Sequence, residues 1–344
     1  MQDRKIRNME EFAAVAGISR PTVSKYFHDP ESVKKSTRSR IEAALEEHDY
    51  RPNIFAMNQN RQLTKNVGIV VPYLADPYFA EIARTIERAL IDAGFFPLLY
   101  SAHGEAGIEV EILDSLRALK PAGVLLAPLG RRSSNRAEIE RFCDEVPTIL
   151  FDSNIEGIGE AFVGSDNYSF VSQTVDYLVG EGMEPCFIEM TTPANPNAVR
   201  RHEAYLAKME QYGLQPRVVG FDGQGWDFER IGREGMLRLI ESGGPPTRAV
   251  LCSNDRLAIG VLAACYEKGL RVGRGDGTAL CVASHDDHPF SRFTCPALTT
   301  SRHDYQAVAG GAVDTLLDLI AAGGRFDTRH ETLFPTQFVK RASA

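Results

Sequence analysis

Several polar side chains stand just beyond apolar runs of this sequence. Asp255 and Asp286 each follow such a run, and Asp76 lies in the loop after another. Carboxylates accept hydrogen bonds from hydroxyl groups, and the guanidinium of Arg201 donates in a fixed fork. Parallel α/β sheets bind ligands outside the carboxyl ends of their strands. The set therefore fits a polyhydroxylated ligand better than a flat purine base.

Aromatic side chains accompany these polar groups. Trp226 is the sole tryptophan and lies in a glycine-rich loop, while Tyr78 and Phe79 come shortly after Asp76. Flat aromatic rings stack on the C–H faces of sugars. Two alternatives stay open: Trp226 is a packing residue, and Phe79, in phase with Ile82, belongs to the core.

The polar candidates also have structural alternatives. Asp76 and Asp255 are placed to cap the helix that follows each of them. Arg201, beside Arg200, suits a surface salt bridge, and Asp286 suits a solvated loop.

Catalytic and metal-binding patterns are weak. Ser284, His285 and Asp286 are adjacent, so they cannot align as nucleophile, base and orienting group. The segment 285–288 is better explained as a solvated loop than as a metal site. No glycine-rich phosphate motif follows a predicted strand. We expect no enzyme activity, no metal and no cofactor.

From residue 67 the sequence alternates between short apolar runs and amphipathic stretches. The predicted strands are 67–71, 96–100, 123–127, 148–151, 185–190, 217–220, 249–253 and 279–283. The predicted helices are 77–93, 110–119, 138–143, 169–181, 199–212, 229–241 and 256–268. The two halves of this series share one layout, which predicts two doubly wound parallel-sheet α/β subdomains.

Residues 9–28 read as two short helices joined by a tight turn. Asn8 and Ser19 are placed to cap them, and Gly17 suits the turn. A third helix is predicted at 37–48. The expected core of this all-α domain is Phe12, Val15, Ile18, Val23, Phe27, Ile41 and Leu45. A helix-turn-helix of this layout places its second helix in a DNA major groove.

Composition is that of a globular protein, with 43% hydrophobic and 24% charged residues among 344. The net charge of −8 divides into +3 over residues 1–65 and −11 over the rest, so the head is mildly basic. Six scattered cysteines predict reduced thiols. No apolar run could span a bilayer and no leader is visible, so we expect a cytoplasmic protein without membrane contact.

A set of motif residues spans the head: Ala13, Ala16-Gly17-Ile18-Ser19, Thr22-Val23-Ser24 and Tyr50-Arg51-Pro52-Asn53. In them the sequence resembles the lactose-repressor (LacI/GalR) family of bacterial transcription regulators, and the resemblance extends through nearly the whole chain. It implies a helix-turn-helix domain at 1–52, a hinge helix or linker at 53–65, and a periplasmic-binding-protein-like core at 66–344. It also implies a homodimeric regulator, a repressor by expectation, that binds a palindromic operator.

The resemblance assigns DNA contacts to the head and the hinge. They are Arg20, Pro21, Thr22, Ser24, Lys25, His28, Lys34, Thr37, Asn53, Ala56 and Met57. In the family a hinge leucine wedges the minor groove, but this chain has Gln59 at that position. Either Met57 substitutes, or the DNA is bent less, or the hinge works differently.

The resemblance also supports the ligand site. Asp76-Pro77-Tyr78-Phe79 is similar to the family's Asn-Pro-Phe-Phe, and Asn254-Asp255 opens its Asn-Asp-x-x-Ala-x-Gly motif. The effector contacts implied are Asp76, Tyr78, Phe79, Arg201, Trp226, Asp255 and Asp286. A sugar or sugar derivative is the expected effector. A purine or nucleoside effector is the alternative, and a solute-binding protein for transport is a further one.

Overall fold

The computed structural model describes residues 6, 8–48, 50, 64–130, 133–193 and 195–344. The chain divides into two compact units, residues 1–64 and 65–344. The predicted hinge contacts Asn53, Ala56 and Met57, and Gln59 with them, lie outside the described residues.

The first unit is helical, as the sequence predicted. Its elements are α1 (Met9–Ala16), α2 (Arg20–His28), the short 3₁₀ helix η1 (Pro30–Ser32) and α3 (Lys35–His48). The Asn8 side chain caps α1 by accepting from the Glu11 N–H at 2.9 Å, and Gly17 ends it with φ of 64°. At the start of α2 the hydroxyl of Ser19 instead contacts that of Thr22, at 2.8 Å.

The core of this unit forms around three fully buried side chains, Phe12, Val23 and Ile41. Tyr50 stacks on the Phe12 ring with centroids 4.6 Å apart. One predicted core residue is wrong: Val15 is 52% exposed. Helix α1 turns Phe12 and the neighbouring Ala13 inward and leaves Val15 beside that face.

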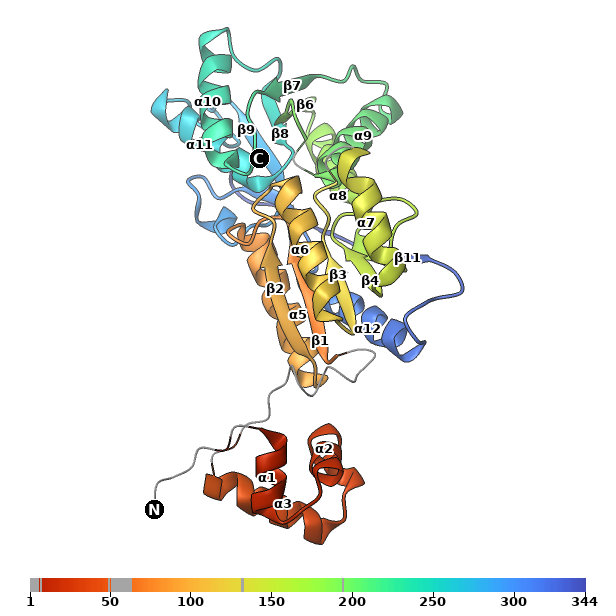
Figure 1. Cartoon of the computed structure of the whole chain (residues 1–344). Coiled ribbons are helices and arrows are strands. Elements are labelled where there is room, and N and C mark those ends of the chain that lie inside the picture. Colours follow the sequence, from red (N-terminus) through yellow and green to blue (C-terminus); the bar gives the residue numbers. More distant parts are fainter. Residues whose placement is uncertain (1–5, 7, 49, 51–63, 131–132, 194) are drawn as a thin grey trace. The chain divides into compact units, whose positions relative to one another are not determined.

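The second unit is built on two six-stranded sheets, which define an N-subdomain and a C-subdomain (Figure 1). The N-subdomain sheet has the order β11-β5-β4-β3-β1-β2. Its strands are β1 (Asn66–Val71), β2 (Phe96–Ser101), β3 (Gly123–Leu126), β4 (Thr148–Phe151), β5 (Ala161–Ser165) and β11 (His330–Phe334). All of its neighbours pair in parallel.

The C-subdomain sheet has the order β12-β10-β9-β8-β6-β7. Its strands are β6 (Pro185–Met190), β7 (Val218–Phe221), β8 (Ala249–Cys252), β9 (Cys281–Asp286), β10 (Thr299–Arg302) and β12 (Gln337–Val339). Only β12 runs antiparallel to its neighbour. The similar strand orders agree with the repeated layout that the sequence predicted.

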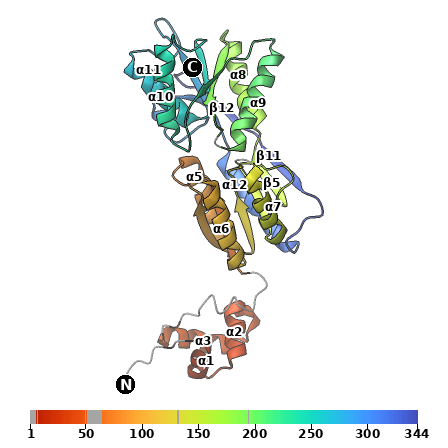
Figure 2. The ribbon, with the colours of Figure 1, turned by 45° about the horizontal axis from the view of Figure 1, so that its top comes forward.

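Helices cover both faces of each sheet, which is why the central strands are almost entirely buried (Figure 2). In the N-subdomain α5 (Pro77–Asp92) packs against α12 (Tyr305–Ala321), and α6 (Ala106–Leu119) against α7 (Ser133–Glu145). In the C-subdomain α8 (Asn167–Gly180) packs against α9 (Pro196–Gln211), and α10 (Phe228–Glu241) against α11 (Asp255–Glu267).

The chain passes between the subdomains three times: after β5, after β10 and after β11. The elements from β10 onward were not among those predicted from the sequence. They matter for the site, because the crossovers bring side chains that follow β5 and β10 together. Within the described residues, no helix is both long and apolar enough to cross a membrane.

Candidate functional sites

Helix α2 presents the predicted DNA-contacting face. Val23 is completely buried, whereas Arg20, Pro21, Ser24 and Lys25 are exposed. Thr22 is half-buried, and the side chain of His28 lies outside the described residues. Near the start of α3, Lys34 is exposed and Thr37 is half-buried. The exposed set joins two cations to small polar groups on one short helix, which suits contact with base edges and phosphates.

The second candidate site is a pocket between the two subdomains. Its empty volume is about 690 Å³, counted with the part of the pocket that is open to solvent. Side chains that follow strands of both sheets form its wall. The wall comprises Asp76, Tyr78, Phe79, Asp152, Glu189, Met190, Pro193, Asn195, Asn197, Ala198, Arg201, Trp226, Phe228, Ser253, Asn254, Arg256, Asp286 and His303. Six of the seven predicted effector residues are among them.

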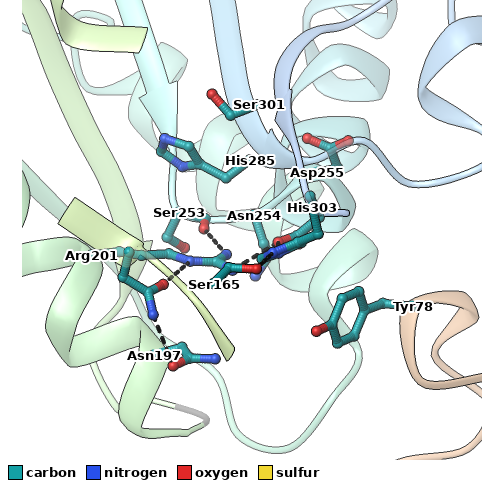
Figure 3. A network of polar contacts seen from close by, with 12 residues as sticks. Tyr78, Ser165, Asn197, Arg201, Ser253, Asn254, Asp255, His285, Ser301 and His303 are labelled. Carbon is teal, nitrogen blue, oxygen red and sulfur yellow. Dashed lines mark hydrogen bonds and ion pairs between the residues drawn. The ribbon is translucent and has the colours of Figure 1, made fainter. Parts of the chain in front are cut away.

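Arg201 lies in the centre of a network of polar contacts in this wall (Figure 3). Its Nη2 donates to Asp286 Oδ1 at 2.8 Å, and its Nη1 donates to the Ser253 carbonyl at 2.7 Å. Its Nε donates to Asn167 Oδ1 at 3.4 Å, and the guanidinium stands 4.8 Å from the centre of the Phe170 ring. The side chain is 9% exposed, so Arg201 is a fixed wall group and not a surface salt bridge.

Asp286 is held by groups on three sides. Besides Arg201, His303 Nε2 lies 3.3 Å from its Oδ1, and the Tyr305 hydroxyl donates to its carbonyl oxygen at 3.1 Å. Nδ1 of His303 contacts the Ser165 hydroxyl at 2.8 Å, which ties β10 to β5. Burial opposes ionisation of Asp286, but the charges of Arg201 and His303 overcome it and lower its pKa to about 2. Asp286 is therefore a permanent acceptor at neutral pH.

A second group of contacts crosses the pocket from the N-subdomain. The Tyr78 hydroxyl donates to Asp152 Oδ1 at 2.7 Å, and Asn197 Nδ2 donates to Asp152 Oδ2 at 3.2 Å. Asn167 Nδ2 donates to Asn197 Oδ1 at 3.1 Å and so joins this group to Arg201. Burial raises the pKa of Asp152. Tyr78 thus faces the pocket with its hydroxyl committed to a carboxylate.

Asp76 has the structural role that the sequence left open as an alternative. It caps α5 by accepting from the Tyr78 N–H at 3.0 Å. Its other oxygen accepts from Arg256 Nη1 at 3.1 Å, and Arg256 is also held by Glu229. Burial raises the pKa of Asp76 to about 6, although the charge of Arg256 opposes that rise.

The aromatic candidates form a cluster at the pocket wall. Trp226, 6% exposed, stacks on Tyr73 with centroids 5.7 Å apart and meets Phe79 and Phe228 edge-on. A Cβ at Gly104, where φ is +73°, would lie 2.3 Å from the Trp226 ring, so glycine is required there. Phe79 is 3% exposed and belongs to the core as well as to the wall.

Asp255 differs from the expectation for it. It is completely buried and outside the pocket wall. Its carboxylate accepts from the hydroxyls of Ser291 and Thr300 and from the His288 N–H. The cap of α11 is Asn254, which accepts from the Leu257 N–H. The first helical residue turns inward, so neither the cleft contact nor the helix cap predicted for Asp255 is found.

Sequence reasoning missed eight wall residues with polar side chains: Asp152, Glu189, Asn195, Asn197, Ser253, Asn254, Arg256 and His303. The signal for Asp152 was present, because it directly follows the predicted strand 148–151. Arg256 directly follows Asp255, which was predicted as an effector contact. His303 follows β10, which was not predicted, and Asn197 lies at the start of α9.

Two family models match the chain. The model for bacterial regulatory proteins of the lacI family covers residues 8–53, and that for a periplasmic binding protein-like domain covers residues 175–344. The HTH-type transcriptional repressor CytR of Escherichia coli strain K12 is 27% identical over 90% of this chain and 89% of its own length. The ribose operon repressor of the same strain is 27% identical over 91% of this chain and 92% of its own length.

Solved structures agree on the fold. A crystal structure of the Lac repressor dimer bound to operator and the anti-inducer ONPF superposes with a TM-score of 0.83. It is 23% identical, and the match covers 98% of this chain and 99% of that one.

The chain therefore combines a helix-turn-helix head of the kind found in bacterial regulatory proteins with a periplasmic binding protein-like core of two parallel sheets. Its head matches the lacI family of bacterial regulatory proteins over residues 8–53. The relatives to which about nine tenths of the chain is similar are transcriptional repressors.

The burial of Asp255 predicts a pH-dependent effect of its substitution. Burial, and then the charge of Asp286, raise the Asp255 pKa to about 7, whereas an unfolded aspartate titrates near ~3.9. Ionisation of Asp255 therefore destabilises the folded state progressively as the pH rises from the unfolded pKa to the folded pKa. Asp255→Asn removes this cost, so the wild type should lose about 1–3 kcal/mol relative to the variant between pH 5 and pH 8.

Urea unfolding at several pH values measures this difference. Asp166→Asn, a substitution at the half-buried cap of α8, is the control and should show a constant difference. A constant difference for Asp255→Asn as well would contradict the prediction.

Proposed function

We propose that this protein is a transcription regulator that binds a palindromic operator as a homodimer in the cytoplasm. We further propose that a sugar or sugar derivative, bound in the inter-subdomain pocket, sets its affinity for the operator. The observation that carries the effector assignment is the fixed pair of Arg201 and Asp286. It offers a donor fork and a permanent acceptor within one wall. Neighbouring hydroxyls on a sugar ring suit such a pair.

The charges of the wall favour an uncharged polyhydroxylated effector. Four carboxylates line the pocket, those of Asp76, Asp152, Glu189 and Asp286, against two guanidinium groups. An excess of acceptors suits a ligand that brings hydroxyl donors and disfavours one with negative charge. One relative is by its name a repressor of a ribose operon, which supports a sugar.

Exposed apolar side chains support the homodimer. Strand β2 is an edge of its sheet and carries Phe96, 53% exposed, near Ile91 at the end of α5, 52% exposed. Tyr266 and Phe293 of the C-subdomain are 84% and 76% exposed. Apolar groups of this size are typical of a surface that another chain covers. A two-fold dimer would match a palindromic operator, and the Lac repressor structure is a dimer on its operator.

Regulation would follow from linkage. If the effector binds two arrangements of the subdomains with different affinity, it shifts the population toward one of them. The same coupling free energy then appears in the affinity for DNA, and operator DNA must alter effector affinity by the same factor.

The effector is expected to change the emission of Trp226. Titration with sugars, sugar phosphates and nucleosides should give a saturable shift with an uncharged sugar. Arg201→Lys should weaken binding at least about tenfold, because loss of a charge-assisted hydrogen bond costs roughly 1.5–3 kcal/mol. Arg200→Lys, a matched substitution at the neighbouring position, should bind normally. Saturation by a nucleoside, with no response to any sugar, would favour the purine alternative.

Operator recognition is expected to depend on Lys25. DNA selected from a random palindromic library by the wild type serves as the operator. Lys25→Ala should bind it with about 1–3 kcal/mol less free energy if the lysine contacts a base. Arg141→Ala, which removes an exposed cation from α7, is the control. An unchanged preference for the selected DNA over random DNA in Lys25→Ala would show that α2 is misplaced as the recognition helix.

Light scattering of the wild type is expected to give twice the chain mass. Phe96→Asp places a charge on the exposed edge strand and should shift the equilibrium toward monomer. Leu333→Asp makes the same change on β11, the opposite edge of that sheet, where the side chain is 50% exposed. A tetramer mass, or equal dissociation of both variants, would contradict the assignment of the interface.

A further inference from the structure

Arg256 occupies a position at which the Asn-Asp-x-x-Ala-x-Gly motif specifies no residue. The structure nevertheless places its guanidinium in the wall of the pocket, with the side chain 13% exposed. Its contacts reach both subdomains. The residue is therefore a feature of this chain that the motif does not account for.

On the C-subdomain side Glu229 fixes the orientation of Arg256. Nε and Nη2 of the arginine donate to the two carboxylate oxygens of Glu229, each at 2.7 Å. Helices α10 and α11 approach so closely that a Cβ at Gly260 would lie 2.1 Å from the Glu229 carbonyl oxygen. The guanidinium also lies 5.3 Å from the centre of the Phe228 ring. A bidentate pair on two tightly packed helices leaves the guanidinium little freedom.

On the N-subdomain side the partner is Asp76. Nη1 of Arg256 donates to Asp76 Oδ2 at 3.1 Å, while Asp76 Oδ1 caps α5. The two side chains are 13% and 9% exposed, so water screens the pair poorly. Removal of one member would leave the other charge buried and unpaired, which is strongly unfavourable.

Two other polar contacts between the subdomains have neutral donors: Asn197 donates to Asp152, and the Tyr305 hydroxyl donates to the Asp286 carbonyl oxygen. Trp226 of the C-subdomain also stacks on Tyr73 of the N-subdomain. Among the pocket-wall contacts described here, Arg256–Asp76 is thus the ion pair that joins the subdomains. Its separation would also draw Trp226 away from Tyr73.

We infer that Arg256 is a clasp: by pairing with Asp76 it holds the two subdomains closed over the pocket in the absence of effector. The inference rests on the proposed function in taking this pocket as the effector site. An effector that hydrogen-bonds to Asp76 competes with Arg256 for it. Without effector, the Arg256–Asp76 ion pair then sets the arrangement of the two subdomains. A bound effector either replaces this ion pair or leaves it in place.

The decisive variant is Asp76→Asn. Asparagine caps a helix as well as aspartate does and has nearly the same shape. With its amide oxygen on the Tyr78 N–H, its amide nitrogen would face the donors of Arg256. We expect an open cleft, in which acrylamide quenches the emission of Trp226 severalfold more strongly than in the wild type. Arg256→Gln should give the same increase.

Two control variants separate the clasp from general loosening. Asp166→Asn makes the same substitution at the cap of α8, where the aspartate accepts from the Tyr168 N–H in the same pattern. Its quenching should equal that of the wild type. Arg230→Gln makes the same substitution as Arg256→Gln at an exposed arginine of α10 that pairs with Asp227, and it should also give quenching close to that of the wild type. Circular dichroism of each full-length variant verifies that it is folded.

Unchanged quenching in folded Asp76→Asn overturns the clasp, whatever the other variants show. An increase in Asp76→Asn that Asp166→Asn shares also overturns it. The measurement needs neither effector nor DNA. Failure of the clasp is therefore distinct from failure of the proposed function, which the sugar titration and the operator-binding assay test.

Discussion

Buried charge between two parallel sheets is the constraint on which the pocket depends. Arg201 and Asp286 are both largely removed from water, where either charge would be strongly unfavourable without the other. Their pairing fixes the end of β9 relative to α9. His303 and Ser165 extend the contact to the two crossover segments. One ion pair thereby organises side chains that follow several separate strands.

The same principle acts at the other side of the pocket. Asp76 faces Arg256, and Asp152 faces the hydroxyl of Tyr78 and the amide of Asn197. Each carboxylate that lines the pocket wall at these points has a donor from the protein. A ligand that enters must exchange hydrogen bonds with groups already satisfied, so its own donors and acceptors have to match theirs. If the pocket is the effector site as proposed, this requirement would make it selective and would link its occupancy to the arrangement of the subdomains.

The elements follow largely from local sequence. Apolar runs such as 67–71 and 249–253 became central parallel strands, and Gly17 ended α1 in the left-handed region. Motif residues of the head were sufficient to predict helix α2 and the face that it exposes. These features depend on residues within a few positions of one another, where periodicity and capping preferences act directly.

The sequence by itself determined the helical head, the two-sheet core and six residues of the wall, because strand ends in such folds carry ligands. Only the tertiary structure decided which polar side chains face the pocket. Asp255 turned inward to three donors, whereas Arg256, one residue later, reached the wall. His303 joined the site through a crossover from a strand that the sequence had not revealed. The direction in which each of these side chains points depends on contacts with residues far away in the chain, and local sequence patterns do not reveal such contacts.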